Sequence, residues 1–382
     1  MQALRIGIVV GEVSGDQLGA GLIRALQALH PGVQIEGVAG SAMRQAGCEV
    51  WEDAESLAVM GLVEPIKVLP RLLRLRRSLI RRWLENPPDV FVGIDAPDFN
   101  LGLEQALRKR GITTVHYVSP TVWAWRQGRV RKVAKAVDKV LCIFPFEPEF
   151  YEAHDVAAEF VGHPLADNLN PDMDVAALRN ELELTADTVV AVMPGSRSNE
   201  IARLGPVFAQ ACARLIDQYP DLQFVSPMVN ARLRKVFQLH IEEAGITTRV
   251  KLIDGKAEKA IAAADVVLLA SGTAALQTAL LGKPMVAAYK LSPLTFLLHR
   301  WFKLVKVKYF AMPNLLTDEP LVPEFLQNQA TPEALAIAVG ELLDNGERRA
   351  EIHRKFVVLR ADLARGAQQR AAKAILDLAE KS

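Results

Sequence analysis

The sequence predicts an α/β protein with two doubly wound parallel sheets, and three observations lead to this fold class. Short runs rich in Val and Ile alternate with amphipathic helical patterns along most of the chain. The strand segments are continuously apolar, which is typical of parallel sheets covered by helices on both faces. A polar connection rich in Asp, Asn and Pro, His163–Asp174, separates two such sets of elements and is typical of an interdomain linker.

The expected strands fall into two groups joined by helices such as Gln17–Leu29 and Leu101–Lys109. The first group comprises Arg5–Val10, Val33–Val38, Val90–Ile94, Thr113–Val118, Lys139–Ile143 and Glu159–Val161. The second group comprises Val189–Met193, Leu222–Pro227, Val250–Ile253, Val266–Leu269 and Met285–Tyr289. In sheets of this kind ligands bind at the carboxyl ends of the strands.

The length of 382 residues favours two domains, each large enough to bury a core. We expect a first domain over residues 1–168 and a second over residues 169–344. The block Thr331–Ser382 is helical throughout, and we expect it to pack across both domains, with the helices of residues 345–382 completing the first.

The composition excludes several classes of protein. A net charge of +1, from 45 Lys and Arg against 44 Asp and Glu, provides no general attraction for nucleic acid. Three cysteines outside any CxxC pair indicate buried thiols in a reducing cytosol. We expect no signal peptide, and polar residues interrupt the longest uncharged stretch, Val266–Gly282, so we expect no transmembrane helix.

A turn in the second domain has the character of an anion site. The segment VVAVMPGSRSNEI places Gly195, Ser196 and Arg197 between a strand and a helix. A glycine turn into a helix N-terminus offers free N–H groups to a phosphate, and an arginine can bind phosphate oxygens in a bidentate manner. An ordinary strand-to-helix turn with a surface arginine is the alternative.

A second turn of the same kind favours binding of a nucleoside diphosphate. Ser271, Gly272 and Thr273 follow a strand and open a helix, and Gln277 one turn later could contact a ribose. Neither turn has the GxxxxGK[ST] or GxGxxG pattern. No histidine pair has metal-ligand spacing, and the one Asp-x-Asp pair lies in the linker. We therefore expect diphosphate binding by N–H groups and arginine, with no metal and no cofactor.

Two carboxylates in the first domain are candidates for acid–base chemistry. In FVGIDAPDFN, Asp95 and Asp98 follow a buried strand. Asp95 comes directly after the strand and before Ala-Pro, so it is the better candidate for a general base. Asp98 precedes a helical pattern and could instead be an N-cap.

Other polar and aromatic residues of the first domain could form a pocket for an acceptor. The segment HYVSPTVWAWRQGRV follows the next strand, and the alternative for it is core packing with a solvated basic helix. The early segment GEVSGD is a glycine-rich turn whose two acids do not suit a phosphate; its side chains could hydrogen-bond the acceptor, or Asp16 could cap the helix that follows it. The acceptor-side candidates are Glu12, Ser14, Asp98, Ser119, Trp123, Trp125 and Arg126.

A basic, apolar segment suggests contact with an anionic membrane surface. Ile66–Leu84 contains six arginines, one lysine and no acid, with leucines at helical spacing. Leu297–Phe310 has a similar character. An ordinary amphipathic helix with a cationic solvent face is the alternative. The residues expected to face the membrane are Leu69, Leu72, Leu73, Arg74, Arg77 and Trp83.

The ordered motifs of the chain resemble those of the lipid-A-disaccharide synthase family. They are GEVSGD, VMGLVE, VGIDAPDFN, HYVSPTVWAWRQGRV, FVGHPLAD, PGSR, LASGTAAL and MPNLL, and the match extends from about Leu4 to the last helix. The resemblance implies a GT-B glycosyltransferase with two Rossmann-like domains facing across a cleft. Such enzymes join UDP-2,3-diacylglucosamine to 2,3-diacylglucosamine 1-phosphate (lipid X). The products are UDP and a β-1,6-linked disaccharide 1-phosphate, made at the cytoplasmic face of the Gram-negative inner membrane.

The resemblance also implies roles for individual residues. The first Asp of IDAPDFN, Asp95, would be the catalytic base; the Arg of PGSR, Arg197, would bind the UDP phosphates; and Asn314 of MPNLL would lie at the donor site. Gln277 stands where related sequences commonly have Glu, which removes a charge-assisted bond to ribose.

The implied partners are the acylated UDP-sugar donor, the acylated sugar-phosphate acceptor and an anionic membrane surface. The sequence leaves the oligomeric state open, with a homodimer as one possibility. A UDP-sugar 2-epimerase on the same scaffold and a non-catalytic nucleotide-sugar or lipid binder are the alternative functions. Release of UDP only when donor and acceptor are both present would support the transferase.

Overall fold

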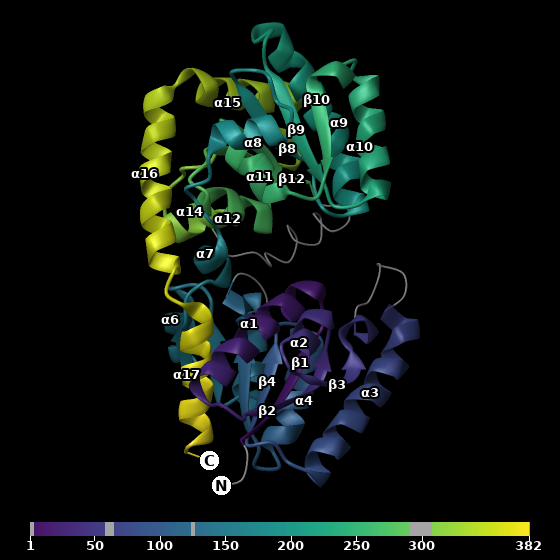
Figure 1. Ribbon diagram of the computed structural model, residues 1–382, viewed down its shortest axis with the longest axis vertical. Helices are drawn as coiled ribbons and strands as arrows, with labels where there is room; N and C mark the ends of the chain where they lie inside the picture. The colour runs from purple at the N-terminus through teal and green to yellow at the C-terminus, as the bar shows by residue number, and fades with distance from the viewer. Residues whose placement is uncertain (1–3, 58–64, 124–126, 291–307, 382) are drawn as a thin grey trace. The chain divides into compact units, whose positions relative to one another are not determined.

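The structure is a computed structural model that describes residues 4–57, 65–123, 127–290 and 308–381. The chain forms two compact units (Figure 1). Unit 1 comprises Met1–Asp167 together with Leu363–Ser382, and unit 2 comprises Asn168–Asp362. Each unit contains one parallel sheet with helices on both faces, so the predicted fold class is confirmed.

Unit 1 has a seven-stranded sheet in the order β3-β2-β1-β4-β5-β6-β7. The strand order reverses between β1 and β4, which is where ligands bind in doubly wound folds. The strands are β1 (Arg5–Val10), β2 (Gln34–Ala39), β3 (Glu49–Asp53), β4 (Val90–Ile94), β5 (Thr113–Tyr117), β6 (Lys139–Cys142) and β7 (Ala158–Phe160). The helices are α1 (Val13–Leu29), α2 (Ser41–Gln45), α3 (Pro65–Glu85), α4 (Pro97–Arg108), α5 (Val130–Ala136), α6 (Glu147–Glu152), α7 (Pro164–Asn168) at the boundary, and α17 (Ala367–Ala379).

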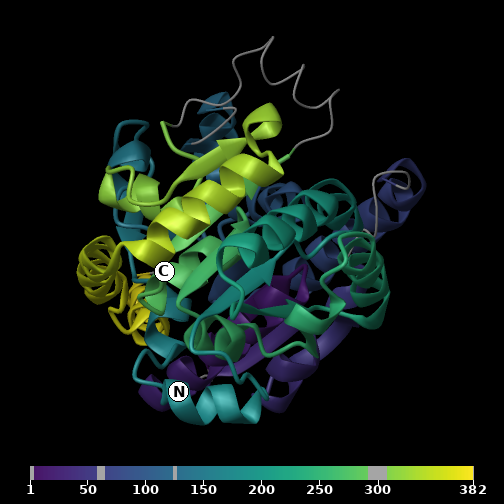
Figure 2. The same cartoon turned by 90° about the horizontal axis from the view of Figure 1, so that it is seen from above.

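Unit 2 has a six-stranded sheet in the order β10-β9-β8-β11-β12-β13, with the reversal between β8 and β11. Helices α9 and α15 lie side by side in this unit (Figure 2). The strands are β8 (Val189–Met193), β9 (Gln223–Met228), β10 (Val250–Asp254), β11 (Val266–Ala270), β12 (Met285–Tyr289) and β13 (Glu324–Leu326). The helices are α8 (Val175–Glu181), α9 (Ser198–Gln218), α10 (Ala231–Glu243), α11 (Ala257–Ala263), α12 (Thr273–Leu280), α14 (Met312–Thr317), α15 (Pro332–Asp344) and α16 (Gly346–Leu363). Short 3₁₀ turns η1–η5 span Ala54–Ser56, Thr121–Trp123, Gln127–Arg129, Thr247–Arg249 and Gln327–Gln329.

The C-terminal helices divide differently from the expectation. Residues 345–382 were expected to complete the first domain, but α16 belongs to unit 2 up to Asp362, and only α17 lies in unit 1. The Arg360 guanidinium donates to the Leu169 carbonyl within unit 2. In unit 1 the Asp167 carboxylate accepts from the amides of Gly366 and Ala367 at the start of α17.

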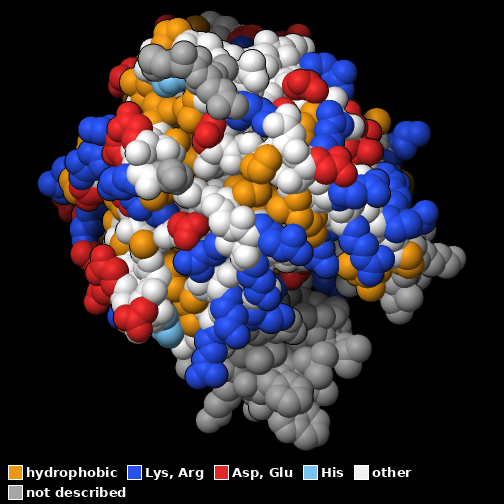
Figure 3. All heavy atoms as spheres, turned by 90° about the horizontal axis from the view of Figure 1, so that it is seen from below, with side chains coloured by type: hydrophobic (Ala, Val, Ile, Leu, Met, Phe, Trp, Pro, Cys, Tyr) orange, Lys and Arg blue, Asp and Glu red, His pale blue; other side chains and the backbone are white. Residues whose placement is uncertain are grey.

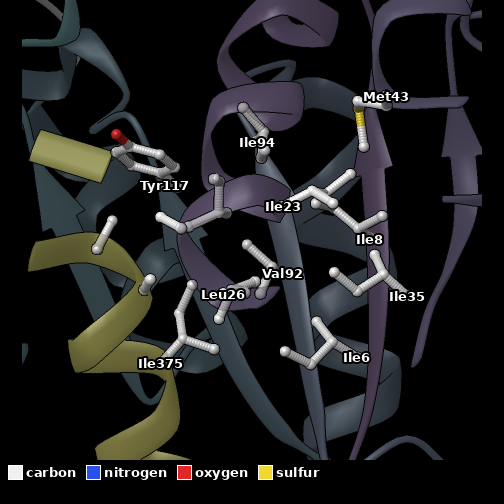
Figure 4. Close-up of a cluster of buried hydrophobic side chains, with 14 of the residues drawn as sticks. Ile6, Ile8, Ile23, Leu26, Ile35, Met43, Val92, Ile94, Tyr117 and Ile375 are labelled. Atoms are coloured by element: carbon white, nitrogen blue, oxygen red, sulfur yellow. The ribbon is translucent and has the colours of Figure 1, made fainter. Parts of the chain in front are cut away.

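The core of unit 1 lies on both faces of its sheet. On one face, Ile6, Val92 and Ile94 pack against Ile23 of α1 and Ile375 of α17 (Figure 4). Each of these side chains is fully buried, which contributes about 1.5–3 kcal/mol per side chain to folding. The buried residues of the other face include side chains from α3, α4, β1, β2 and β4. The packing on both faces of the sheet fixes the positions of the strand ends, where the candidate site residues of unit 1 lie.

Candidate functional site

A cavity of about 400 Å³ lies at the strand reversal of unit 2. The loops after β8 and β11 form its walls, because β8 and β11 are adjacent and parallel in the sheet. The cavity contains every predicted donor residue except Asn314: Gly195, Ser196, Arg197, Ser271, Gly272, Thr273 and Gln277. Two loops that are far apart in the sequence are therefore brought to one site.

The first loop of this cavity differs from the expectation of free backbone donors. The Glu200 carboxylate accepts from the amides of Ser196 at 2.9 Å and Arg197 at 3.3 Å, through Oε2. Its Oε1 lies 3.4 Å from Nη1 of Arg197. An acid of the chain thus fills the anion position at the start of α9, while the Arg197 side chain is 82% exposed and available to a ligand.

The second loop leads into a helix whose start has no side-chain cap among the described residues. Helix α12 begins at Thr273, and the amides of a first turn have no partners within the helix. Ser271 donates its amide to the Ala288 carbonyl at 2.9 Å, which ties the loop to β12. Both Gly272 and Thr273 are exposed, and Gln277 is half-buried one turn into α12. The amides of this helix start could therefore donate to a phosphate.

Two residues with polar side chains in the cavity, Glu200 and Tyr289, were not predicted from the sequence. Glu200 is the third residue of α9, a position whose acidic side chain can bond preceding amides. Tyr289 ends β12 and is half-buried in the same cavity, where burial raises the pKa of its hydroxyl. A tyrosine at a strand end is a signal that sequence reasoning could have used.

Asn314 lies outside this cavity and has a structural role in the described residues. Its side chain is 1% exposed. The amide nitrogen donates to the Val322 carbonyl at 2.8 Å and to Glu324 at 2.6 Å. Its oxygen accepts from the Val322 amide at 2.8 Å. The carboxamide joins α14 to β13, so the structure does not place Asn314 as a direct donor ligand.

Asp95 lies at the strand reversal of unit 1, directly after β4. Its φ is 49° and that of Ala96 is 43°, so two successive non-glycine residues adopt the left-handed conformation. Such strain persists only where surrounding contacts impose it, and it is concentrated at functional sites. The Asp95 amide donates to the Tyr117 carbonyl at 2.9 Å. The carboxylate is half-buried.

The loop after β1 touches the Asp95 turn. A Cβ on Gly11 would lie 2.7 Å from the Ala96 Cβ, so only glycine permits this approach. Glu12 and Ser14 are exposed beside it. The prediction that Asp16 caps the helix that follows it is wrong. Asp16 is 5% exposed, and its carboxylate accepts from the amides that open α2: Gly40, Ala42 and Met43.

Asp98 is in the first turn of α4 but is not its N-cap, which is Ala96. Its side chain is 88% exposed and pairs with Arg129. This ion pair connects the start of α4 to the segment that begins α5. Asp98 therefore differs from Asp95 in both exposure and partner.

The predicted acceptor residues Ser119 and Trp123 belong to one buried network. The Trp123 indole donates to Glu147 Oε1 at 2.9 Å. Glu147 Oε2 accepts from the amides of Ile143 and Phe144 at 3.1 and 3.0 Å. Ser119 Oγ lies 3.0 Å from the Tyr151 hydroxyl. Burial raises the pKa of Glu147 to about 7. Trp125 and Arg126 lie outside the described residues.

Helix α3 only partly matches the predicted membrane surface. Leu69 is 52% exposed, and Arg74 and Arg77 are exposed. Leu72 packs against the core and Leu73 is half-buried. The prediction is wrong for Trp83, which is 0% exposed and packs against Trp51 and Phe91 with centroid distances of 5.1 and 4.9 Å. Most of Leu297–Phe310 lies outside the described residues.

The surface charge is distributed in groups. The face drawn in Figure 3 shows clusters of Lys and Arg side chains, with acidic and hydrophobic side chains between them. Among the helices of the described residues, none is both long and apolar enough to span a bilayer. Across the same residues, no group of three or more His, Cys, Asp or Glu side chains is arranged as a metal site.

Comparisons with solved structures define the class of protein. A putative UDP-N-acetylglucosamine 2-epimerase from Listeria monocytogenes matches with a TM-score of 0.67 and 14% identity, over 100% of this chain and 97% of that one. CalG4, the calicheamicin glycosyltransferase, matches with a TM-score of 0.61 and 16% identity, over 100% and 99%. These likenesses, together with the two parallel sheets, place the chain in the GT-B fold class.

Comparisons of sequence give the family. A model of the lipid-A-disaccharide synthetase family matches residues 6–378. The lipid-A-disaccharide synthase of Azotobacter vinelandii is 49% identical over 99% of both chains, and that of Alkalilimnicola ehrlichii is 48% identical over 98% of both. The chain belongs to the lipid-A-disaccharide synthase family. It is an enzyme, a glycosyltransferase of lipid A biosynthesis, and the epimerase alternative is not favoured.

Proposed function

We propose that the chain transfers 2,3-diacylglucosamine from its UDP derivative to the 6-hydroxyl of 2,3-diacylglucosamine 1-phosphate. The bond between the sugar C1 and the UDP oxygen breaks, and a bond between C1 and the acceptor oxygen forms. Because the donor is α-linked and the product β-linked, a single in-line displacement accounts for the inversion. The proposal rests on two side chains, one at the strand reversal of each unit. They are the exposed Arg197 in unit 2 and the Asp95 carboxylate in unit 1.

Unit 2 binds the UDP moiety in this proposal. The first turn of α12 and the Arg197 guanidinium face the cavity that would hold the diphosphate. These groups stabilise the charge that develops on the leaving oxygen. The half-buried Gln277 contacts the ribose through neutral hydrogen bonds. We propose that this set of groups acts without a metal ion. Turnover that is unchanged after treatment with a chelator is the result expected.

Unit 1 supplies the base. Asp95 accepts the proton of the acceptor hydroxyl as the sugar gains oxocarbenium character. Glu12 and Ser14, exposed beside the Asp95 turn, hydrogen-bond the hydroxyls of the acceptor sugar. The loop of Ser119 and Trp123 forms another wall of the acceptor site, and the Glu147 network holds that loop.

A peripheral position at the cytoplasmic face of the inner membrane is part of the proposal. The exposed Leu69, Arg74 and Arg77 of α3 support it. Each basic residue near anionic lipid contributes about 1 kcal/mol to binding. A homodimer stays a prediction, which light scattering on the purified chain tests.

The decisive assay supplies donor alone, acceptor alone, and both together. We expect UDP release only with both substrates, with one disaccharide formed per UDP by mass spectrometry. An isomerase would convert the donor sugar without acceptor, and a binding protein would release no UDP. Either of those results contradicts the proposal.

A further inference from the structure

The inner face of helix α4 carries a polar ridge in the core of unit 1. Asn100 and Glu104, one helical turn apart, are both 0% exposed and lie against the sheet. On the opposite face of β4, Val92 and Ile94 belong to a cluster of buried hydrophobic side chains (Figure 4). Burial of an amide and a carboxyl group is costly unless their bonds repay it. We therefore expect these two buried polar side chains to have a specific role.

Asn100 bonds the strand ends at the reversal of unit 1. Its amide nitrogen lies 2.8 Å from the Asp95 carbonyl, 3.3 Å from that of Ile94 and 3.4 Å from that of Val9. Val9 of β1 is the register partner of Gly93 in β4, so the amide spans the two strands between which the order reverses. One side chain thus connects β1, β4 and the left-handed turn that presents Asp95.

The turn needs this connection because its backbone is strained. Asp95 and Ala96 both have positive φ, and other contacts fix only part of the turn. The amides of Phe99 and Asn100 bond the Ala96 carbonyl at 3.0 Å. The Asp95 carbonyl is bonded by the Asn100 side chain. A rotation of that peptide would redirect the Asp95 carboxylate.

A buried acid–imidazole pair lies one helical turn from Asn100 on the same face of α4. Glu104 Oε1 lies 2.7 Å from His116 Nδ1, and both side chains are fully buried. His116 of β5 is the register partner of Gly93 in β4. A Cβ on Gly93 would lie 2.1 Å from Glu104 Oε1 and 3.1 Å from the Asn100 Cβ. Because residue 93 is glycine, the Asn100 and Glu104 side chains can lie directly against the β4 backbone. This close contact fixes the position of α4 along β4.

We propose that Asn100, supported by the Glu104–His116 pair, is a positioning residue that holds the Asp95 turn in its reactive orientation. This inference rests on the proposed role of Asp95 as the base. A polar ridge that fixes register is a known use of buried polar groups. A displacement of about 1 Å at a reacting group can lower a rate by about a hundredfold.

The test compares Asn100→Ala with Leu103→Ala in the full-length chain. Leu103 lies on the same helix, is also fully buried, and bonds no part of the Asp95 turn. The measurements are kcat, the KM for each substrate, the Kd for UDP and the melting temperature. We expect Asn100→Ala to lower kcat by about tenfold to a hundredfold, with an unchanged Kd for UDP, which binds in unit 2. We expect Leu103→Ala to lower the melting temperature while kcat, measured well below it, stays near the wild-type value.

Glu104→Gln keeps the size of the side chain. It tests whether the Glu104–His116 pair positions Asn100, and it can be used if Asn100→Ala does not fold. We expect its kcat to fall by about tenfold at unchanged UDP affinity. Wild-type kcat in the folded Asn100 or Glu104 variant overturns the inference, as does an equal loss in Leu103→Ala. Asp95→Asn separates this result from the parent proposal, because normal turnover in that variant would remove the base itself.

Discussion

The Glu200 carboxylate lies 2.9 Å from the backbone nitrogen of Ser196, at the start of α9 where the sequence predicts a phosphate. The same carboxylate bonds the Arg197 amide. The cavity at the strand reversal of unit 2 therefore contains the Glu200 carboxylate beside Arg197, the arginine that would bind the diphosphate. If UDP binds in this cavity, as proposed, its affinity is expected to depend on Glu200.

Glu200→Gln is expected to bind UDP more tightly. The amide oxygen of Gln can still accept from the Ser196 amide, while the repulsion of a carboxylate near the diphosphate is removed. That repulsion is about 1 kcal/mol at 4 Å in water, so we expect about a fivefold lower Kd in isothermal titration. Glu347→Gln, an exposed acid in the first turn of α16, is the matched control. Weaker binding in Glu200→Gln would show that the carboxylate organises the loop instead.

Arg197→Ala is expected to weaken UDP binding without unfolding the protein. A hydrogen bond to a charged group contributes about 1.5–3 kcal/mol, which corresponds to roughly a tenfold to hundredfold higher Kd. The Arg197 side chain is 82% exposed, so its loss should leave the melting temperature unchanged. Arg214→Ala, an exposed arginine of the same helix, should bind UDP normally. Equal affinities in the two variants would remove Arg197 from the donor site.

Glu147 is expected to make the free energy of unfolding depend on pH. Its pKa is raised from 4.5 to about 7 by burial. Between these pH values the folded state binds more protons than the unfolded state. Its contribution to stability is therefore fully present below pH 4.5 and is lost as the pH rises through 7. The integrated change is about 3 kcal/mol.

The comparison of wild type with Glu147→Gln isolates this contribution, which denaturant unfolding at several pH values measures. Burial lowers the pKa of His163 to about 4, so His163 acts in the opposite direction in both proteins. We expect the difference in unfolding free energy between them to vary with pH over this range. A constant difference contradicts the assignment.

Substitutions of exposed and of buried residues in helix α3 are expected to affect membrane binding and folding separately. Arg74→Glu with Arg77→Glu should lower binding to vesicles that contain anionic lipid, at an unchanged melting temperature, because both side chains are exposed. Trp83→Ala should instead lower the unfolding free energy by about 3–5 kcal/mol, because the ring is fully buried. Sedimentation with vesicles and thermal melting measure the two effects. Equal vesicle binding by the charge-reversal variant would exclude α3 as the membrane surface.

The sequence predicted most of the fold because its signals are local. Apolar strands and amphipathic helices identify themselves over a few residues, and glycine turns mark the loops at both strand reversals. The edge strands β3 and β13 were missed because β3 carries three acids and β13 has only three residues. Neither has the apolar run that marks a central strand.

The candidate site was predicted less completely, because the partners of its side chains are distant in the sequence. The Asp16 carboxylate accepts from the amides of Gly40, Ala42 and Met43, and the Asn314 side chain bonds residues eight and ten positions later. Trp83 has helical spacing typical of a surface helix, but it packs against Phe91 of β4. In each case a long-range contact, which no local pattern encodes, decides the role of the side chain.

Turnover of Asp95→Asn tests the central claim most directly. The substitution keeps the shape of the side chain and removes its ability to accept a proton, and a general base contributes about a hundredfold or more. We expect at least about a hundredfold loss of disaccharide synthesis, with UDP bound as tightly as by wild type. Asp98→Asn, which removes a neighbouring carboxylate paired with Arg129, should keep most of the turnover. Near-normal synthesis by Asp95→Asn would contradict the account.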